Sequence, residues 1–240
     1  MIDFFHTVLY VPIYNLLIFL TDVLPGGDIG LAVVIATIIV KFAIMPLSLA
    51  ALRTQRAMKL MEPELKALRE KYKDKQEEQA REMFALYKRY GVNPFAGILT
   101  LFIQLPIIIT LFWVFQSKTL LTVDTSLLYS FVPSPEMISP AFLGIFLVTG
   151  TSITLAAVAG VTQFLQARYA IPIPAKAEKP SMSADMGRAM AFQMRYLLPV
   201  FMAAISYTSV ALALYFITTN IVGLAQEYYV RKTERKPQTA

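Results

Sequence analysis

The sequence predicts an all-α, polytopic membrane protein: a five-span helical bundle with a charged helical hairpin on its cytoplasmic side. Of the 240 residues, 56% are hydrophobic and only 16% are charged, and the mean hydropathy is +0.56. This balance is far from that of a soluble globular domain. Apolar blocks long enough to cross a bilayer recur along the chain, and they leave no room for a sizeable aqueous catalytic domain.

Residue usage excludes several kinds of chemistry. The chain has no cysteine, which rules out disulfides, thiolate metal sites, a cysteine nucleophile and cysteine-linked lipid anchors. A single histidine, His6, argues against zinc chemistry. No Ser-His-Asp set, glycine-rich phosphate loop or pair of intramembrane carboxylates can be assembled. We therefore expect a binding protein without metal or cofactor, and not an enzyme.

Residues 1–27 are expected to form an amphipathic helix that lies in the membrane interface on the exterior side. Polar residues recur at helical spacing along it: Asp3, Thr7, Tyr10, Tyr14 and Thr21. The alternative is a spanning helix from Phe4 to Leu24, which Pro12, Asn15 and Asp22 disfavour. No basic residue precedes the apolar region, so we expect neither a cleaved secretory signal nor a transit peptide, and we interpret the chain as a mature bacterial product.

The first span, residues 28–52, carries Lys41 near the centre of an apolar stretch. That stretch, IGLAVVIATIIVKFAIMPLSLAAL, is long enough to cross the ~30 Å hydrocarbon core of a bilayer. An ammonium group at that depth costs at least ~2.5 kcal/mol on insertion scales, so it should face water or a partner instead of lipid. Snorkelling to an interface is the alternative, but about half of the span lies on either side of the residue. Lys41 is therefore a candidate functional residue.

Residues 53–93 predict a cytoplasmic helical hairpin. They hold 11 Lys or Arg and 7 Asp or Glu, with apolar residues at helical intervals. Pro63, which follows Glu62, is predicted at a helix start, where proline loses no hydrogen bond. The apolar side chains of interest are Met58, Met61, Met83 and Phe84. They could contact a soft partner, although mutual packing of the two arms is the favoured interpretation. The positive net charge could orient the chain or attract anionic lipid.

The remaining apolar blocks predict four more spans. Small residues in the third span permit close helix packing, and Ser206 to Ser209 divide the last block into two short helices. The predicted segments are span two at 94–116, an exterior loop at 117–139, span three at 140–166, a cytoplasmic loop at 167–187, spans four and five at 188–207 and 208–227, and a basic tail at 228–240.

Basic residues set the predicted orientation. Every Lys and Arg other than Lys41 and Lys118 lies in the hairpin, in or beside the second polar loop, or in the tail. The positive-inside rule places these segments in the cytoplasm. We therefore expect a multi-pass protein of the bacterial inner or plasma membrane, with an exterior N-terminus and a cytoplasmic C-terminus.

Polar residues of the spans predict one shared wet surface. Thr37 and Lys41 are four residues apart and Ser48 is seven further on, so the three lie on nearly one helical face. Other polar residues that can extend this surface are Gln104, Gln163, Gln166, Thr218, Thr219 and Asn220. For Gln104, Gln163 and Asn220 taken singly, interhelical packing is an equally good interpretation.

Four stretches resemble the YidC (Oxa-type) membrane protein insertase family in content and order. They are TIIVKFAIMPLSLAALRTQRAMKLMEPELKALREKY, EMFALYKRYGVNPFAGILTLFIQLPIIITLFW, AGVTQFLQAR and ALALYFITTNIVGLAQEYY. The most specific parts are the basic residue in the first span, MxPEL in the hairpin, GVNP before the second span, QLP within it and LYxxxxN in the last. The resemblance covers residues 29–229.

The resemblance implies an ATP-independent insertase and chaperone with a hydrophilic groove that is open to cytoplasm and lipid and closed externally. Nascent membrane proteins and the lipid bilayer are the implied partners. Cooperation with the Sec translocon, the signal recognition particle receptor and the ribosome is left open, and no sequence-specific nucleic acid is expected. The candidate groove residues are Thr37, Lys41, Ser48, Gln104, Gln163, Tyr215, Phe216 and Asn220.

Three positions depart from the family pattern. Lys41 stands where relatives usually carry arginine, Phe216 stands where they carry Trp or Tyr, and Ser209-Val210-Ala211 replaces the usual Pro-x-Gly. A compact ammonium can lose its proton when it is dehydrated, whereas a guanidinium effectively cannot. The departures bear on the strength of the groove and on the last turn.

Two other functions stay open at this point. The first is a small transporter or channel subunit in which Lys41 binds an anion or acts as a gating charge; the lack of inverted repeats and of intramembrane carboxylates disfavours it. The second is a structural scaffold, which would tolerate replacement of the Thr37-Lys41-Ser48 stripe by leucine.

Overall fold

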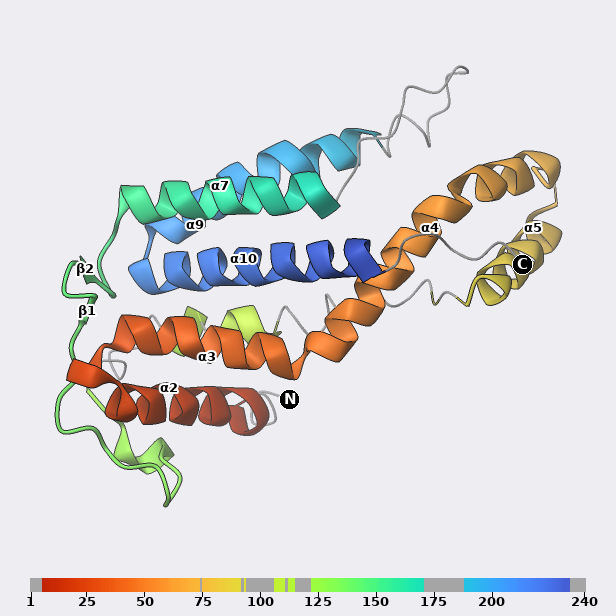
Figure 1. The fold of residues 1–240 in the computed structure, drawn as a ribbon. Helices are drawn as coiled ribbons and strands as arrows, with labels where there is room; N and C mark the ends of the chain where they lie inside the picture. The colour runs from red at the N-terminus through yellow and green to blue at the C-terminus, as the bar shows by residue number, and fades with distance from the viewer. Residues whose placement is uncertain are drawn as a thin grey trace. The chain divides into compact units, whose positions relative to one another are not determined.

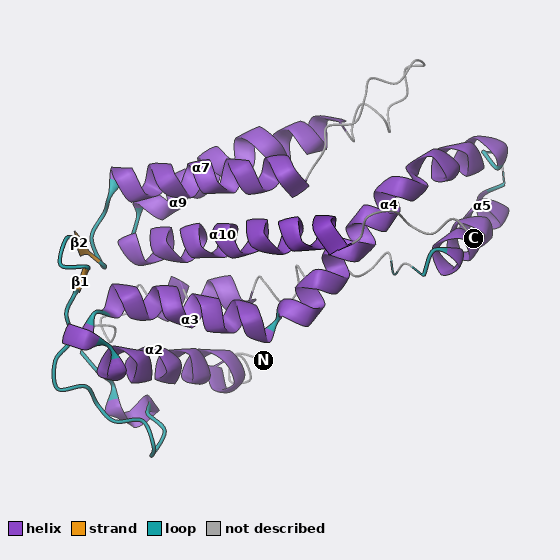
Figure 2. Ribbon diagram, in the orientation of Figure 1, coloured by secondary structure: helices purple, strands orange, loops and turns teal. Residues whose placement is uncertain are grey.

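The computed structural model describes residues 6–73, 75–91, 93, 106–110, 112–114, 122–170 and 188–233. This part of the chain is helical apart from one short β-hairpin and the turns (Figures 1 and 2), so the prediction of an all-α membrane protein is confirmed. Three helical stretches are long and apolar enough to cross a bilayer: His6–Val23, Arg188–Tyr207 and Val210–Thr233. A fourth results if Ile29–Ala43 and Met45–Lys71 are taken as one broken span.

The chain forms two compact units. Unit 1 comprises Met1–Ala43 and Pro106–Tyr229, and unit 2 comprises Ile44–Leu105 and Val230–Ala240. Several predicted features lie outside the described residues, namely Gln104, most of the second span, most of the loop at 167–187 and the end of the tail. Residues 106–110 and 112–114 of the second span are helical.

In unit 1 the π-helical turn η1 (His6–Tyr10) continues into α2 (Val11–Val23), which packs against α3 (Ile29–Ala43). Pro12 lies where the π-helical turn η1 passes into α2, and it donates no backbone hydrogen bond there. The contact is apolar: Leu17 and Ile18 of α2 and Ala32 and Val33 of α3 are all buried. Burial of this stripe on each helix explains why the two helices lie side by side.

Three polar residues of α2 face the protein, whereas Asp22 is exposed. Tyr14 and Thr21 are fully buried, and Asn15 is 2% exposed. The Tyr14 hydroxyl accepts a hydrogen bond from the backbone N–H of Asp124 at 2.9 Å. The Asn15 amide donates to the Leu127 carbonyl at 2.8 Å and accepts from the Tyr129 N–H at 2.7 Å. The expected polar stripe therefore holds residues 122–130 against α2, including the 3-10 turn η4 (Thr125–Leu127). An interfacial location for α2 stays a prediction.

Asp28 joins the start of α3 to the β-hairpin that follows residue 140. One carboxylate oxygen accepts from the Leu31 N–H at 2.9 Å and caps α3, and the other accepts from the Leu143 N–H at 2.7 Å. The preceding turn η2 (Pro25–Gly27) ends in Gly27, which has φ 64°, and a Cβ there would collide with the Met137 carbonyl. Only glycine fits this close approach of two backbones.

The third predicted span is wrong at its N-terminal end. Strands β1 (Ala141–Phe142) and β2 (Phe146–Leu147) pair antiparallel, and α7 (Ile153–Ala170) begins only after a further turn. The Ser152 hydroxyl accepts from the Leu155 N–H at 3.3 Å and marks the helix start. Pro140, Gly144 and Gly150 favour turns over a helix, and the apolar residues between them had suggested a span.

Helix α7 packs closely on the helical stretch that contains η5 (Gln193–Leu197) and α9 (Leu198–Tyr207). At the contact, a Cβ added to Gly160 would lie 2.9 Å from the Ala203 Cβ. Gly160 is thus one of the small residues that permit close helix packing, as predicted. The chain then turns at Thr208 and Ser209, inside the segment Ser206–Ser209 where the sequence predicts a break.

Helix α10 (Val210–Thr233) is the interior helix of unit 1. Every residue from Val210 to Phe216 is buried. Neighbouring parts of the protein therefore cover all sides of these first two turns. Its first turn is fixed to the turn before α7: the Val210 N–H donates to the Gly150 carbonyl at 2.9 Å, and the Ala211 N–H donates to the Val148 carbonyl at 3.1 Å. The Ser209 hydroxyl donates to the same Val148 carbonyl at 3.2 Å.

The first predicted span is not one helix. Helix α3 ends at Ala43, Ile44 lies outside both helices, and α4 (Met45–Lys71) begins a new helix with Pro46 in its first turn. In a continuous helix the Pro46 ring would clash with the Phe42 carbonyl, and one hydrogen bond would be lost. The uninterrupted apolar run from residue 29 to residue 52 concealed this break.

Unit 2 contains the helical hairpin of α4 and α5 (Gln76–Arg89). Its core consists of Met61, Leu65 and Leu86. Pro63 lies inside α4, so its predicted place at a helix start is wrong. Residues Met61 and Leu65 continue one apolar face across the proline, and their burial against α5 offsets the hydrogen bond that Pro63 cannot donate.

We predict that Asp28→Ala destabilises unit 1. The substitution removes an N-cap and leaves the Leu143 N–H without its acceptor, so the free energy of unfolding should fall by about 1–3 kcal/mol. Thermal unfolding in detergent would measure the change. The control is Asp22→Ala at an exposed carboxylate of α2, which should have little effect; equal effects of the two substitutions would contradict the role given to Asp28.

Candidate functional site

The candidate groove residues that the structure describes lie on four helices. Thr37 and Lys41 are on α3, Ser48 is on α4, Gln163 is on α7, and Tyr215, Phe216 and Asn220 are on α10. The break at Ile44 puts Ser48 on a different helix and in a different unit from the other two. The prediction that Thr37, Lys41 and Ser48 share one face of one helix is therefore wrong.

The hydroxyls of this predicted stripe bond to their own helices. Thr37 is 3% exposed and its hydroxyl donates to the Val33 carbonyl at 2.7 Å. The Ser48 hydroxyl donates to the Ile44 carbonyl at 3.2 Å. Such bonds satisfy a hydroxyl inside an apolar environment. Both hydroxyl donors are therefore already used within the protein, and each residue is less polar toward its neighbours than a free hydroxyl would be.

Lys41 lies in the last turn of α3 and is partly buried. It follows Thr37 by one helical turn, so both occupy the same side of α3. Its ammonium complements the negative end of the helix dipole at this terminus. The residue lies near the end of α3, just before the break at Ile44, and its place near the centre of a membrane span stays a prediction.

Asn220 connects α10 to α7. It is 1% exposed, and its amide donates to the Thr162 hydroxyl at 3.2 Å and to the Ala159 carbonyl at 3.4 Å. This is the packing role that the sequence left as an equal alternative. Gln163, the next residue on α7, is partly exposed.

Tyr215 and Phe216 belong to the buried part of α10. They are 2% and 6% exposed, and their ring centroids lie 5.2 Å apart in a tilted arrangement. Aromatic pairs at this separation add to the energy of burial. The structure thus places both rings in the packed interior of unit 1, and their contact with a groove stays a prediction.

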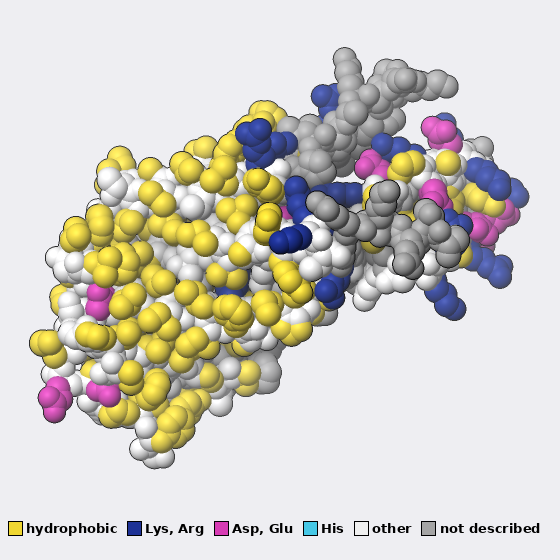
Figure 3. Space-filling view, viewed as in Figure 1, with side chains coloured by type: hydrophobic (Ala, Val, Ile, Leu, Met, Phe, Trp, Pro, Cys, Tyr) yellow, Lys and Arg dark blue, Asp and Glu magenta, His cyan; other side chains and the backbone are white. Residues whose placement is uncertain are grey.

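The two ends of unit 1 differ in charge. Among its described residues, the carboxylates on the loop segments and beside the α2–α3 turn are Asp22, Asp28, Asp124 and Glu136. The basic residues lie where α3 and α7 end and where the α9 stretch begins: Lys41, Arg168, Arg188 and Arg195. Glu227 on α10 is a buried carboxylate near the C-terminal end of that helix. Between the charged ends the visible surface is dominated by hydrophobic side chains (Figure 3), as expected of a bundle that lies in lipid.

Comparison with known proteins identifies the family. A family model described as 60Kd inner membrane protein matches residues 19–237. Membrane protein insertase YidC 2 of Bacillus anthracis is 31% identical over 222 residues, which cover 90% of this chain and 76% of that protein. The chain belongs to the YidC (Oxa-type) membrane protein insertase family. The resemblance stated from sequence motifs is therefore confirmed.

Other members of the YidC family are equally well covered. Membrane protein insertase YidC of Fusobacterium nucleatum is 28% identical over 207 residues, or 86% of this chain and 87% of that protein. Membrane protein insertase YidC 1 of Halalkalibacterium halodurans is 28% identical over 210 residues, or 85% and 70%. The family is bacterial and membrane-embedded in these members, and it is not a family of conventional enzymes. The chain is accordingly a multi-pass bacterial membrane protein.

The second candidate region, the YidC-type helical hairpin, is held by apolar packing. Met61 is fully buried between the arms, and Met58 and Met83 are partly buried against it. Phe84 is 58% exposed and makes an edge-to-face contact with Tyr87 at 6.3 Å, so its expected packing between the arms is wrong. Three of the four apolar residues therefore hold the arms together, and Phe84 is left on the surface.

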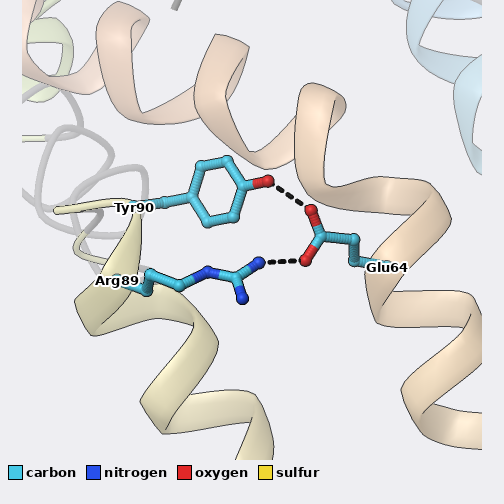
Figure 4. Close-up of polar contacts among 3 residues, drawn as sticks. All are labelled: Glu64, Arg89 and Tyr90. Carbon is cyan, nitrogen blue, oxygen red and sulfur yellow. Dashed lines mark hydrogen bonds and ion pairs between the residues drawn. The ribbon is translucent and has the colours of Figure 1, made fainter. Parts of the chain in front are cut away.

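Charged residues add a surface link to the hairpin. The Glu64 carboxylate on α4 accepts hydrogen bonds from Arg89 and Tyr90 at the end of α5 (Figure 4). Glu62, which is exposed, pairs with Lys66 one turn later at 2.9 Å. Ion pairs at such exposure contribute little to stability. The register of the arms is set mainly by the Met61 core, and the Glu64 contacts add a surface link at the end of α5.

Sequence reasoning missed the cap at Asp28, and it took Tyr14 and Asn15 only as polar residues of an amphipathic helix, not as contacts to residues 122–130. The cap at Asp28 could have been predicted, because an Asp directly before an apolar run is a typical N-cap. Its second hydrogen-bond partner, Leu143, could not have been predicted from local sequence, because it lies 115 positions away. The partners of Tyr14 and Asn15 are equally remote. These residues shape the end of unit 1 that carries the loops.

We predict that Asn220 and Thr162 are energetically coupled. Asn220→Leu and Thr162→Val each remove one partner of the α7–α10 hydrogen bond, and the double variant should be more stable than the two single effects predict by about 0.6 kcal/mol. Unfolding of the four proteins in mixed detergent micelles would give the coupling energy. Strict additivity would show that the hydrogen bond contributes nothing, and Asn220 would then regain its candidacy as a groove residue.

Proposed function

We propose that the chain moves hydrophobic segments of nascent membrane proteins from the cytoplasm into the bilayer through a hydrophilic groove in which Lys41 is the principal cation, without hydrolysing ATP. Membership of the YidC family supports a membrane protein insertase function. The observation that carries the role of Lys41 is its position: a partly buried ammonium at the end of the otherwise apolar α3, at the basic end of unit 1. Such a charge stays in a membrane only where water or a partner meets it.

The energetics of the proposal require no fuel. Transfer of an apolar helix into lipid releases roughly 25 cal/mol for each Å² of apolar surface removed from water. This release can offset the cost of carrying a short polar tail part of the way across. A wet groove lowers that cost further, since the tail keeps part of its hydration.

The loop end of unit 1 supports a groove that is closed on one side. There the starts of α3 and α10 are tied to residues 139–150 through Asp28, Ser139 and Val148. At the other end lie Lys41 and the basic residues of α7 and the α9 stretch. In this proposal the loop end is exterior, and the basic end faces the cytoplasm of a bacterial inner or plasma membrane, as the positive-inside rule requires.

The hairpin is proposed as the cytoplasmic receiving surface. Its exposed residues are mostly charged, and Leu60 and Phe84 add apolar side chains that are 55% and 58% exposed. This mixture suits transient contact with a substrate that is partly apolar. Cooperation with the Sec translocon, the signal recognition particle receptor or the ribosome is part of the same proposal and would use this surface and the basic tail.

We predict that Lys41→Ala slows insertion of substrates whose translocated tails are acidic by roughly tenfold, which corresponds to about 1.4 kcal/mol of lost attraction in the rate-limiting state. Lys41→Arg should preserve insertion, because the charge stays. Protease protection of substrate tails in proteoliposomes would measure the rates.

The controls for Lys41 use the substrate as well as the protein. A substrate with a neutral tail should be inserted at nearly the same rate by both variants. Equal rates for the acidic tail with the unsubstituted protein and with the Lys41→Ala variant would remove the charge from the mechanism. Selective anion flux through the same proteoliposomes, abolished by Lys41→Ala, would instead favour the channel hypothesis.

We predict that Met61→Asp opens the hairpin and impairs insertion while the protein still integrates into the membrane. A carboxylate at this fully buried position should cost several kcal/mol, which exceeds what holds two short arms together. Limited proteolysis within unit 2 would report the opening, and the insertion assay would report the function.

The matched control is Ala67→Asp at an exposed position of the same helix, α4. It adds the same charge without disturbing the core, so the arms should stay closed. Normal insertion by a Met61→Asp protein whose hairpin is demonstrably open would show that the closed hairpin is not needed for the activity.

A further inference from the structure

The β-hairpin at the loop end of unit 1 is apolar on both of its faces. Leu143, Ile145 and Leu147 alternate along the chain and are 61%, 73% and 52% exposed. The neighbouring side chains are less exposed. Phe142 and Phe146 are partly buried, and Val148 is fully buried. A hairpin that meets water on its outer face normally carries polar residues there. The outer face of this one has three large aliphatic side chains.

The hairpin is mounted firmly on the helices. Phe142 lies so close to α3 that a Cβ added to Gly30 would be 2.5 Å from the Phe142 Cβ. Asp28 accepts from the Leu143 N–H, and the Val148 N–H donates to the Pro140 carbonyl at 2.8 Å. The exposed side chains therefore project from a fixed base, and the hairpin cannot simply fold them inward.

Leu143 occupies a backbone conformation that rarely holds leucine. Its φ is 51°, in the left-handed region, and the next residue, Gly144, has φ 70°. Glycine and asparagine adopt this region with least strain and also suit a turn in water. A leucine that is strained and mostly exposed needs a favourable contact outside the chain.

We propose that the hairpin tip formed by Leu143, Ile145 and Leu147 is a lipid contact, seated at the boundary between headgroups and acyl chains of the leaflet next to the loop end of unit 1. The surrounding chain supports lipid as the occupant: no charged residue occurs from Met137 to Ala167. Helix α7, which follows directly, begins with Ile153 at 75% exposure and continues this uncharged surface.

The depth of the contact follows from the backbone. A two-stranded hairpin has edge N–H and C=O groups that need water or headgroups, so it cannot enter the hydrocarbon core. Interfacial segments bury apolar side chains about 5–10 Å into the boundary region. The hairpin would thus hold the loop end of unit 1 at a fixed height. This inference depends only on the membrane location and holds whether or not the groove mechanism is correct.

The absence of cysteine from the chain makes the test direct. Ile145→Cys and, separately, Leu147→Cys would be labelled with an environment-sensitive fluorophore in the full-length protein and reconstituted into phosphatidylcholine–phosphatidylglycerol vesicles. The control is Thr125→Cys, an exposed position with polar neighbours in the same loop region. Equal thermal unfolding of labelled and unlabelled proteins would verify the fold.

The expected result is a blue-shifted emission at residues 145 and 147 and its loss with lipids that carry a quencher high on the acyl chain. Quenching should be weaker with a deep quencher, and the probe at residue 125 should emit as in water and respond to iodide. Two outcomes would overturn the proposal. One is water-like emission at both hairpin positions. The other is a blue shift that lipid quenchers do not reduce, because the apolar contact would then be with protein, such as a second copy of the chain.

Discussion

The carboxylate of Asp28 is the interaction on which the loop end of unit 1 depends. It accepts one hydrogen bond from the first turn of α3 and one from Leu143, which lies 115 positions further along the chain. A carboxylate has enough lone pairs to accept both bonds, whereas a hydroxyl N-cap would have to divide a single oxygen between them. Two backbone hydrogen bonds add to the same junction. The Ser139 N–H donates to the Gly27 carbonyl, and the Ile29 N–H donates to the Ser139 carbonyl. One acidic residue thereby sets both where a helix begins and where a distant hairpin attaches.

Polar groups in the helices of unit 1 are mostly satisfied locally or by a neighbouring helix. Thr21 and Thr37 donate to carbonyls of their own helices, and Asn220 donates to α7. The membrane interior gives such groups no water, so an unpaired one would be costly. Lys41 differs in kind, because an ammonium carries three donors and a full charge, whereas a threonine hydroxyl offers one donor. The polarity of α3 is therefore concentrated in one side chain.

Several features could be read from the sequence because their signals are local. The family motifs, the packing of Met61 between two charged arms and the turn before Val210 depend on residues that are close together in the chain. Pro46 also indicates a helix break, because its ring cannot fit inside a continuous helix. The apolar residues around it nevertheless favoured the prediction of one helix. The hairpin at 141–147 was hidden for the same reason. The partners of Tyr14, Asn15 and Asp28 could not be read at all, because periodicity carries no information about which distant backbone groups meet a side chain.

The bonds between Val148 and the start of α10 have a consequence for biosynthesis. The Val148 carbonyl accepts from Ser209 and Ala211, so the loop end cannot seal until the ribosome has made the chain beyond residue 211. The segments before α10 therefore lack these bonds while the rest of the chain is translated. Truncation just before α10 would therefore remove the hydrogen bonds that Val148 and Gly150 accept and the contact of Asn220 with α7.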